Sequence, residues 1–276
     1  MLRIDQHVHS SLSHDGISNM REHMVHARNY GISEFTFTEH YDDYTGVNTD
    51  IKELDINRYR EEYLKNKDDS FVKTNFGIEI GLRPESYNKI STLVKENKFD
   101  FIIGSSHITC GKDMSRDETF FEGLTPHDAV LRYLNEVLEN VKIYKDEFDV
   151  YGHIDYVIRY VIGNYGKAMT KIDYNEFREI LDEILLSIIK KDKGIEINTS
   201  GVRYGLGTPH PNIGILKRYH ELGGKIITIG SDAHKATQLI NDFNIAYSML
   251  EEAGFNEIAV YHGRKPDFVK VKGTRH

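Results

Sequence analysis

Two histidines, His7 and His9, stand two residues apart in a segment near the start of the chain that is typical of a β-strand. Side chains alternate between the two faces of a strand, so both imidazoles would project from the same face and could bind one metal ion. A His-x-His pair by itself is more often incidental than functional. Its meaning depends on which other side chains the fold brings to the same place.

Imidazole and carboxylate side chains also stand at the ends of other strand-like runs. The segments are Thr38–His40, Gly77–Glu79, Ser105–His107, Gly152–Asp155 and Gly230–His234. Taken singly, each residue could be a core histidine, a solvated carboxylate or, for Asp232, a helix N-cap. Taken together they indicate metal binding, because burying several such groups at one apolar rim is costly unless a cation neutralises them.

The donor atoms available are nitrogen and oxygen, because Cys110 is the only cysteine and a thiolate site or an intramolecular disulfide is excluded. Imidazole mixed with carboxylate suits Zn, Mn or Fe. One ion cannot use all the candidates, so we expect two to three divalent or trivalent ions, with Glu79 as a bridge. The nine candidate ligands are His7, His9, Asp15, His40, Glu79, His107, His153, Asp232 and His234. We interpret His23, His26, His127, His220, His262 and His276 as structural or surface residues.

A scaffold of alternating strands and helices would position these ligands. The expected strands are Leu2–His7, Glu34–Thr38, Phe76–Ile80, Phe101–Ser105, Phe148–Gly152, Ile195–Asn198 and Ile226–Gly230, with Glu257–Tyr261 a possible eighth. The expected helices include Met20–Asn29, with Asn19 and Glu22 as a capping box, Pro126–Tyr144, Tyr174–Lys191, Ile213–Leu222 and Thr237–Glu252. This alternation predicts an α/β fold with a closed or nearly closed TIM-like (β/α) barrel, whose strand ends would carry the site; an open sheet is the alternative.

Composition narrows the class of protein. No linker or repeat divides the 276 residues, which predicts a single domain over residues 1–276. The net charge of −8 is the wrong sign for gripping a nucleic-acid backbone, so we expect no nucleic-acid partner. The sequence has neither a signal-peptide pattern nor an apolar run of membrane-spanning length, which predicts a cytoplasmic protein without a membrane partner. The sequence leaves the oligomeric state open.

The motif series resembles the PHP superfamily, named for its polymerase-associated and histidinol phosphatase members, over essentially the whole chain. The resemblance implies a distorted seven-stranded (β/α) barrel with up to three metal ions. Transferred by position, it assigns His7, His9, Glu79 and Asp232 to a first ion, Glu79, His107 and His153 to a second, and Asp15, His40 and His234 to a third. His14 stands beside Asp15 and could compete with it or support it.

The segments Phe76–Leu82 and Gly152–Tyr156 are similar to the histidinol-phosphate phosphatase branch of that superfamily. This branch implies hydrolysis of a small phosphate monoester, L-histidinol phosphate, to L-histidinol and phosphate in histidine biosynthesis. The alternatives are a PHP-type nucleotide or oligonucleotide phosphoesterase, a metal-dependent C–N hydrolase, and a non-catalytic metal-binding barrel. The C–N hydrolase is disfavoured because none of the strand ends carries its lysine.

Roles follow from the chemistry of phosphate ester hydrolysis. We expect Glu79 to join two ions that activate the attacking water, and Asp232 or His234 to protonate the leaving oxygen. Phosphate oxygens call for guanidinium groups, and Arg83, Arg159 and Arg203 lie just beyond strand ends. A histidinol substrate is cationic, so the loop residues Asp42 and Asp43 are predicted to face its amine or imidazole.

Overall fold

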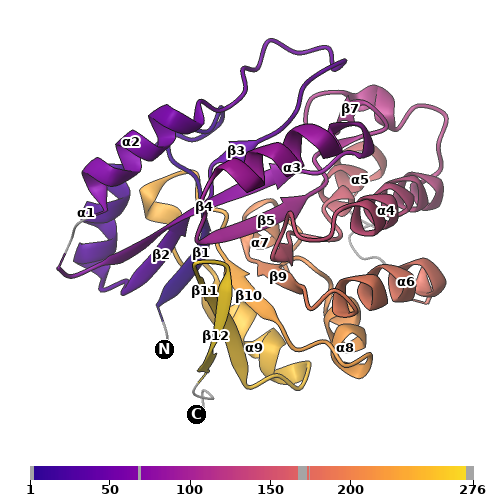
Figure 1. Cartoon of the computed structure of the whole chain (residues 1–276). Coiled ribbons are helices and arrows are strands. Elements are labelled where there is room, and N and C mark those ends of the chain that lie inside the picture. Colours follow the sequence, from indigo (N-terminus) through magenta and orange to yellow (C-terminus); the bar gives the residue numbers. More distant parts are fainter. Residues whose placement is uncertain (1–2, 68–69, 167–172, 174, 272–276) are drawn as a thin grey trace.

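The computed structural model describes residues 3–67, 70–166, 173 and 175–271. Leu2, Tyr174 and His276, which the sequence analysis assigned, lie outside the described residues. Seven parallel strands form one sheet in the order β1–β2–β4–β5–β8–β9–β10. Their bounds are Ile4–Val8, Glu34–Phe37, Lys73–Gly81, Phe101–Ser105, Val150–Tyr151, Gly194–Asn198 and Ile227–Gly230. All seven predicted strands are therefore present, in a mixed α/β fold (Figure 1).

The two outer strands of this order, β1 and β10, meet through the segment that follows β10. The Ala233 carbonyl accepts a hydrogen bond from the His9 amide at 2.8 Å, and the Ala233 amide donates to the His7 carbonyl at 3.3 Å. A parallel bridge between Val8 and Ala233 marks the same contact. The sheet is thus a nearly closed barrel, as predicted, and its closure places the His7–His9 pair beside the segment that carries Asp232 and His234.

A short strand, β3 (His40–Tyr41), adds to the barrel beside β4 after β2 has ended. The long strand β4 pairs with β2 through its first residues and with β3 and β5 through its last. In the β3–β4 register His40 lies opposite Glu79. Two candidate ligands 39 positions apart in sequence are therefore neighbours at one end of the barrel.

Helices lie outside the strands (Figure 1). They are α1 (Met20–Tyr30), α2 (Ile56–Asn66), α3 (Tyr87–Glu96), α4 (Pro126–Ile143), α5 (Val157–Tyr165), α6 (Arg178–Ile189), α7 (Ser200–Arg203), α8 (Ile213–Glu221) and α9 (Phe243–Glu252). The predicted capping box of α1 is confirmed, because the Asn19 side chain accepts from the Glu22 amide and the Glu22 carboxylate accepts from the Asn19 amide. The helix ends at Gly31, whose φ of 65° is left-handed and favours glycine.

The predicted helix Thr237–Glu252 begins later than expected. A 3₁₀ turn spans Ala236–Gln238, and α9 starts at Phe243. Between them Ile240 and Asp242 have φ values of 54° and 60°, which a continuous right-handed helix cannot contain. The reason is visible at Ile240, whose amide donates to the buried Asp5 carboxylate at 2.9 Å and so holds this segment against β1.

The possible eighth strand is wrong as a member of the barrel. β11 (Glu257–His262) pairs antiparallel with β12 (Lys265–Lys270) in a separate hairpin. Its residues contact the beginnings of barrel strands: His262 Nε2 lies 2.6 Å from the Glu34 carboxylate, and the Arg264 amide donates to the Asp100 carbonyl at 2.7 Å. The hairpin therefore covers the end of the barrel opposite the strand ends that carry the candidate ligands (Figure 1).

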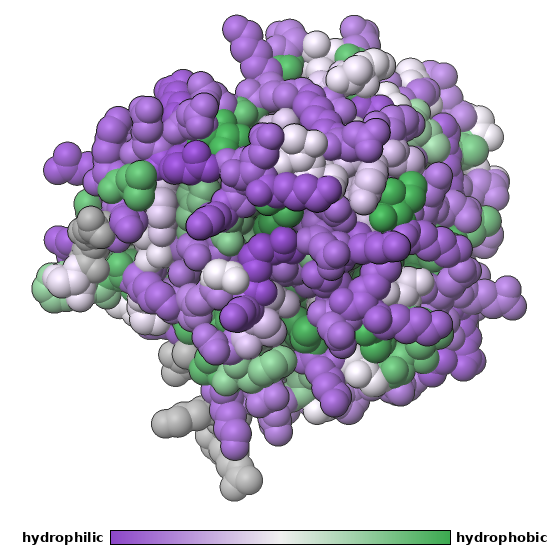
Figure 2. All heavy atoms as spheres, viewed as in Figure 1, coloured by the Kyte–Doolittle hydropathy of each residue, from purple (hydrophilic) through white to green (hydrophobic). Residues whose placement is uncertain are grey.

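Apolar side chains from strands and helices form one extensive core, and a smaller cluster fills the barrel above the hairpin. That smaller cluster consists of Phe101, Ile103, Val150, Ala259 and Tyr261. The surface visible in Figure 2 is mostly hydrophilic, with hydrophobic residues in separate small patches. Among the described residues, no helix combines the length and the apolar character needed to cross a bilayer.

Candidate metal centre

The first group of donor atoms surrounds the end of β1. His7 Nε2 lies 3.0 Å from His9 Nε2, and Glu79 Oε2 is 3.2 Å from the first nitrogen and 3.4 Å from the second. Asp232 Oδ1 approaches the same nitrogens at 3.8 Å and 3.4 Å. Strand periodicity and barrel closure thus bring four of the predicted ligands around one point.

The other oxygen of Glu79 faces a second group. Glu79 Oε1 lies 3.3 Å from His107 Nε2, after β5, and 3.1 Å from His153 Nε2, after β8. The Ser105 hydroxyl donates to this oxygen at 2.7 Å and helps to fix the carboxylate. Glu79 is fully buried, so its two oxygens can serve two neighbouring cations from one rigid position.

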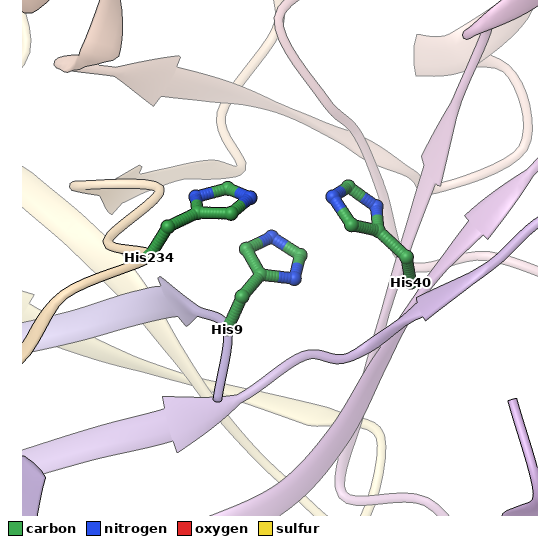
Figure 3. Close-up of side chains that lie close together, drawn as sticks. All are labelled: His9, His40 and His234. Carbon is green, nitrogen blue, oxygen red and sulfur yellow. The ribbon is translucent and has the colours of Figure 1, made fainter. Parts of the chain in front are cut away.

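A third group stands at the outer side of the first. The imidazoles of His9, His40 and His234 converge from the residue after β1, from β3 and from the segment after β10 (Figure 3). Asp15 joins them, with 3.2 Å between its Oδ2 and His234 Nε2 and 3.6 Å between its Oδ1 and His40 Nε2. His14 Nε2 is 4.0 Å from Asp15 Oδ2, at the edge of the group.

The donor set fits cations on its own chemistry. The nitrogens of His7 and His9 face each other at 3.0 Å. Glu79 Oε2 and His234 Nε2 are buried and, despite ionisable neighbours at 3.2 Å, make no hydrogen bond of good geometry in the described part of the chain. Buried polar atoms normally have partners, and a metal ion would satisfy these. Four sets of three side chains have donor atoms close enough to hold an ion, and they draw on eight residues: His7, His9, His40, Asp42, Glu79, His107, His153 and His234.

Electrostatics in the cluster keep the carboxylates ionised. Burial alone would raise the pKa of Glu79, but the imidazoles of His7, His107 and His40 hold it well below its usual range. Burial lowers the pKa of His9, and the neighbouring imidazoles of His40 and His234 lower it further. A neutral imidazole beside an ionised carboxylate is the state in which both can bind a metal ion.

A second layer of polar groups orients the histidines. Glu196, on β9, lies 2.6 Å through Oε1 from His7 Nδ1, the ring nitrogen that points away from the cluster. Its Oε2 accepts from the His153 amide at 3.1 Å and from Asn198 Nδ2 at 3.1 Å. A Cβ on Gly230 would lie 2.5 Å from Glu196 Oε1, so only glycine leaves room for this carboxylate. Carboxylate–imidazole pairs of this kind fix the tautomer and direction of metal-binding histidines.

A model of the PHP domain family matches residues 5–200, which is more than half of the chain. The chain belongs to the PHP family. The histidinol-phosphatase of Lactococcus lactis subsp. lactis is 32% identical over 272 residues, which cover 97% of each protein. A probable histidinol-phosphatase of Clostridium acetobutylicum is 30% identical over 260 residues, covering 92% of this chain and 95% of that protein.

A solved structure is similar to this PHP protein over nearly the whole chain. The histidinol phosphate phosphatase of Lactococcus lactis subsp. lactis, complexed with zinc, L-histidinol and phosphate, superposes with a TM-score of 0.82 at 29% identity. The match covers 96% of this chain and 99% of that one. The barrel fold therefore also includes β10, which lies beyond the residues that the family model matches.

The predicted phosphate-binding arginines of this PHP protein differ in their surroundings. Arg159, on α5, lines a pocket beside the metal-site residues, with its guanidinium over the ring of Tyr204. Arg203 donates through Nη2 to the Asp232 carbonyl at 2.7 Å, and its Nη1 is buried without a partner among the described residues. Arg83 instead donates to the carbonyls of Asp43 at 2.6 Å and Thr45 at 3.2 Å, so its guanidinium is committed to that loop.

The two predicted loop carboxylates are also engaged. Asp42 lies 3.0 Å through Oδ1 from His107 Nδ1 and lines the pocket, where it orients a metal-site imidazole. Asp43 accepts hydrogen bonds from Ser86 at 2.7 Å and Lys89 at 2.9 Å and is not one of the described residues that line the pocket.

Several polar residues of the site were missed by the sequence reasoning. Glu196 stands inside a predicted strand, where its polar character was the available signal. His210 received no assignment, yet it is buried with Nδ1 hydrogen-bonded to Asp155, whose other oxygen accepts from the Asn212 amide at 2.8 Å. Asp155 and His210 are 55 positions apart in sequence, and no local pattern marks them as partners.

Proposed function

We propose that this chain hydrolyses a phosphate monoester, L-histidinol phosphate, to L-histidinol and phosphate. The observation that carries the proposal is the triple cluster of imidazole and carboxylate groups joined through Glu79 on one rim of a PHP barrel. Relatives similar over nearly their whole length are named histidinol-phosphatase, and the similar solved structure holds zinc, L-histidinol and phosphate. Fold, donor set and the ligands of that neighbour all support the same reaction.

Two or three ions of Zn, Mn or Fe would be held by the ligand groups described above. We assign His7, His9, Glu79 and Asp232 to the first, Glu79, His107 and His153 to the second, and Asp15, His40 and His234 to the third. When bound, such ions activate water and neutralise phosphoryl oxygens. The chain's own contribution is to hold their ligands rigidly in a site largely closed to solvent, since His7, His9 and Glu79 are fully buried.

We assign two arginines to the phosphate. Arg159 lines the pocket. Arg203 is not one of the described residues that line it, but its buried Nη1 has no hydrogen-bond partner in the described part of the chain and is free to donate. Guanidinium groups match phosphate oxygens in geometry and do not lose their charge near neutral pH. Asp232 and His234 stay our candidates for protonating the leaving oxygen, because both line the pocket and carry titratable groups.

A substrate panel with metal-reconstituted protein tests the proposal. Metal-free protein is expected to be inactive, and Zn, Mn or Fe should restore hydrolysis with kcat/KM highest for histidinol phosphate among histidinol phosphate, AMP, an aryl phosphate and single-stranded DNA. Glu79→Gln should abolish the activity, while Glu257→Gln, at the start of β11 on the opposite end of the barrel, should retain it. Preference for AMP or DNA would refute the proposed substrate, and a metal-loaded protein inactive on the whole panel would refute catalysis.

A further inference from the structure

A small hairpin beyond β5 brings one more carboxylate into the pocket. Strands β6 (Ile108–Thr109) and β7 (Lys112–Asp113) pair antiparallel directly after the candidate ligand His107. Asp113, the last residue of β7, is 7% exposed and lines the pocket together with metal-site residues. The hairpin therefore places a buried acid beside the metal centre, although neither composition nor strand ends pointed to it.

The Asp113 carboxylate is fixed through one oxygen and open at the other. Oδ1 accepts hydrogen bonds from the Ser115 amide at 2.9 Å and from the Ser115 hydroxyl at 2.6 Å. Among the described residues, Oδ2 has only a long ion pair, 3.8 Å from Nε of Arg116, a side chain that is 49% exposed. An acid that is oriented but weakly neutralised can accept a charged donor from a ligand.

Tyrosine rings connect this acid to the metal-site histidines. The Tyr156 ring stacks on His153 with 4.5 Å between centroids and meets His107 edge-on at 5.5 Å, and its hydroxyl lies 2.6 Å from that of Tyr160. Asp113, Tyr156 and Tyr160 all line the same pocket. The acid and the two rings therefore face one enclosed space.

The other acids of this pocket already have partners. Asp42 pairs with His107, and Asp15 and Asp232 belong to the metal centre. Asp43, the other predicted contact for a cationic substrate, is engaged with Ser86 and Lys89. This leaves Asp113 as the pocket carboxylate best placed to pair with a cation carried by the substrate.

We infer that Asp113 determines specificity by binding the protonated amine of the substrate's alcohol portion, in the pocket that Tyr156 and Tyr160 also line. This inference rests on the proposed function. With the phosphate bound at the metal ligands, the same pocket still offers Asp113 and the rings of Tyr156 and Tyr160, which suit an alcohol that carries an ammonium group and an imidazole. A phosphate ester of an uncharged alcohol forms no ion pair with Asp113, so its hydrolysis should not depend on this carboxylate.

The test compares Asp113→Asn with wild type on histidinol phosphate and on p-nitrophenyl phosphate, whose alcohol portion is uncharged. Asparagine can still accept from Ser115, so the hairpin should persist. We expect kcat/KM for histidinol phosphate to fall about 10- to 100-fold, mainly through KM, as for loss of one hydrogen bond to a charged group, and the aryl ester to change less than about twofold. The matched control is Asp117→Asn, an acid of the same segment bonded to Thr119. It should behave as wild type on both esters.

Equal losses on both esters, or no loss on either, would overturn the inference. A second measurement needs no variant: wild type should disfavour N-acetylhistidinol phosphate, which lacks the ammonium charge, by a similar factor, and equal rates on the two would also refute the role of Asp113. If wild type does not hydrolyse histidinol phosphate at all, the proposed function fails separately. Asp113 is then tested with phosphoethanolamine against p-nitrophenyl phosphate, with the same selective loss expected.

Discussion

Replacing Glu196 with glutamine should weaken metal binding although Glu196 is not one of the assigned ligands. In the native site Oε1 accepts a hydrogen bond from His7 Nδ1, while Oε2 accepts hydrogen bonds from the His153 amide and Asn198 Nδ2. A glutamine amide offers one acceptor and one donor. In either orientation its NH₂ group faces a donor, so at least one of these hydrogen bonds is lost together with the negative charge.

The expected loss of metal affinity follows from the kind of hydrogen bond that is removed. A hydrogen bond to a buried charged group contributes about 1.5–3 kcal/mol, which corresponds to roughly a 10- to 100-fold change in an equilibrium constant. Loss of the groups that orient metal-binding histidines has effects of the same size, about 10- to 100-fold in affinity or activity. We therefore expect the dissociation constant for Zn or Mn at the first site to rise by about 10- to 100-fold.

Chelator competition on metal-free protein measures that constant directly. Asp149→Asn is the matched control, because Asp149 is also a buried carboxylate but pairs with Arg264 at the opposite end of the barrel. This control should leave metal affinity within about twofold of wild type, whatever it does to stability. Wild-type affinity in Glu196→Gln, or the same loss in both variants, would refute the reasoning.

Three further outcomes follow from other residues. The charges of Asp15 and Glu79 outweigh burial and raise the pKa of His40 to about 9, so in metal-free protein the His40 imidazole must lose a proton before it can bind an ion. Loss of this proton should make metal affinity fall by up to about tenfold per pH unit below pH 9. Chelator competition that does not depend on pH would contradict this. Burial lowers the pKa of His23 to about 4, below the roughly 6.5 of an unfolded chain, so the unfolded state gains a proton first as pH falls from 6.5 to 4 and stability drops by about 3 kcal/mol; urea unfolding of His23→Gln should lack this part of the pH dependence, and an unchanged slope would argue against it. Arg203→Ala should raise both KM for the phosphate ester and the inhibition constant of inorganic phosphate about tenfold or more, whereas wild-type values would remove Arg203 from the site.

The barrel was predictable because its strands carry a strong local signal. Runs such as Phe101–Ser105 are apolar, short and followed by helix patterns. Every barrel strand except β9 has an assigned ligand at its end or shortly after it. The hairpin strand β11 has the same kind of sequence, and period alone does not distinguish a parallel barrel strand from an antiparallel one. Its true position depends on partners such as Gln6, more than 250 residues away.

The parts of the site that escaped prediction depend on long-range pairing. Asp42 was predicted to face a cationic substrate, but the pairing of β3 with β4 places this residue just after β3, against His107, 65 residues later. The acid of the β6–β7 hairpin gave no signal, because a two-residue strand has no periodicity to detect. The sequence at the strand ends therefore predicts which side chains meet. The groups that orient these side chains can be identified only from the folded structure.

The hairpin that covers the barrel also bears on how the chain is made. The buried amide of Gln6, in β1, donates to the Ala259 carbonyl at 2.6 Å and accepts from the Tyr261 amide at 2.9 Å, and β1 closes on Ala233. The first strand thus cannot satisfy its polar groups until the ribosome has released residues of the last quarter of the sequence. Contacts of such long separation slow folding and leave the nascent chain with exposed apolar strands. His7 and His9, which are synthesised before every other proposed ligand, are expected to be among the last to acquire their metal ions.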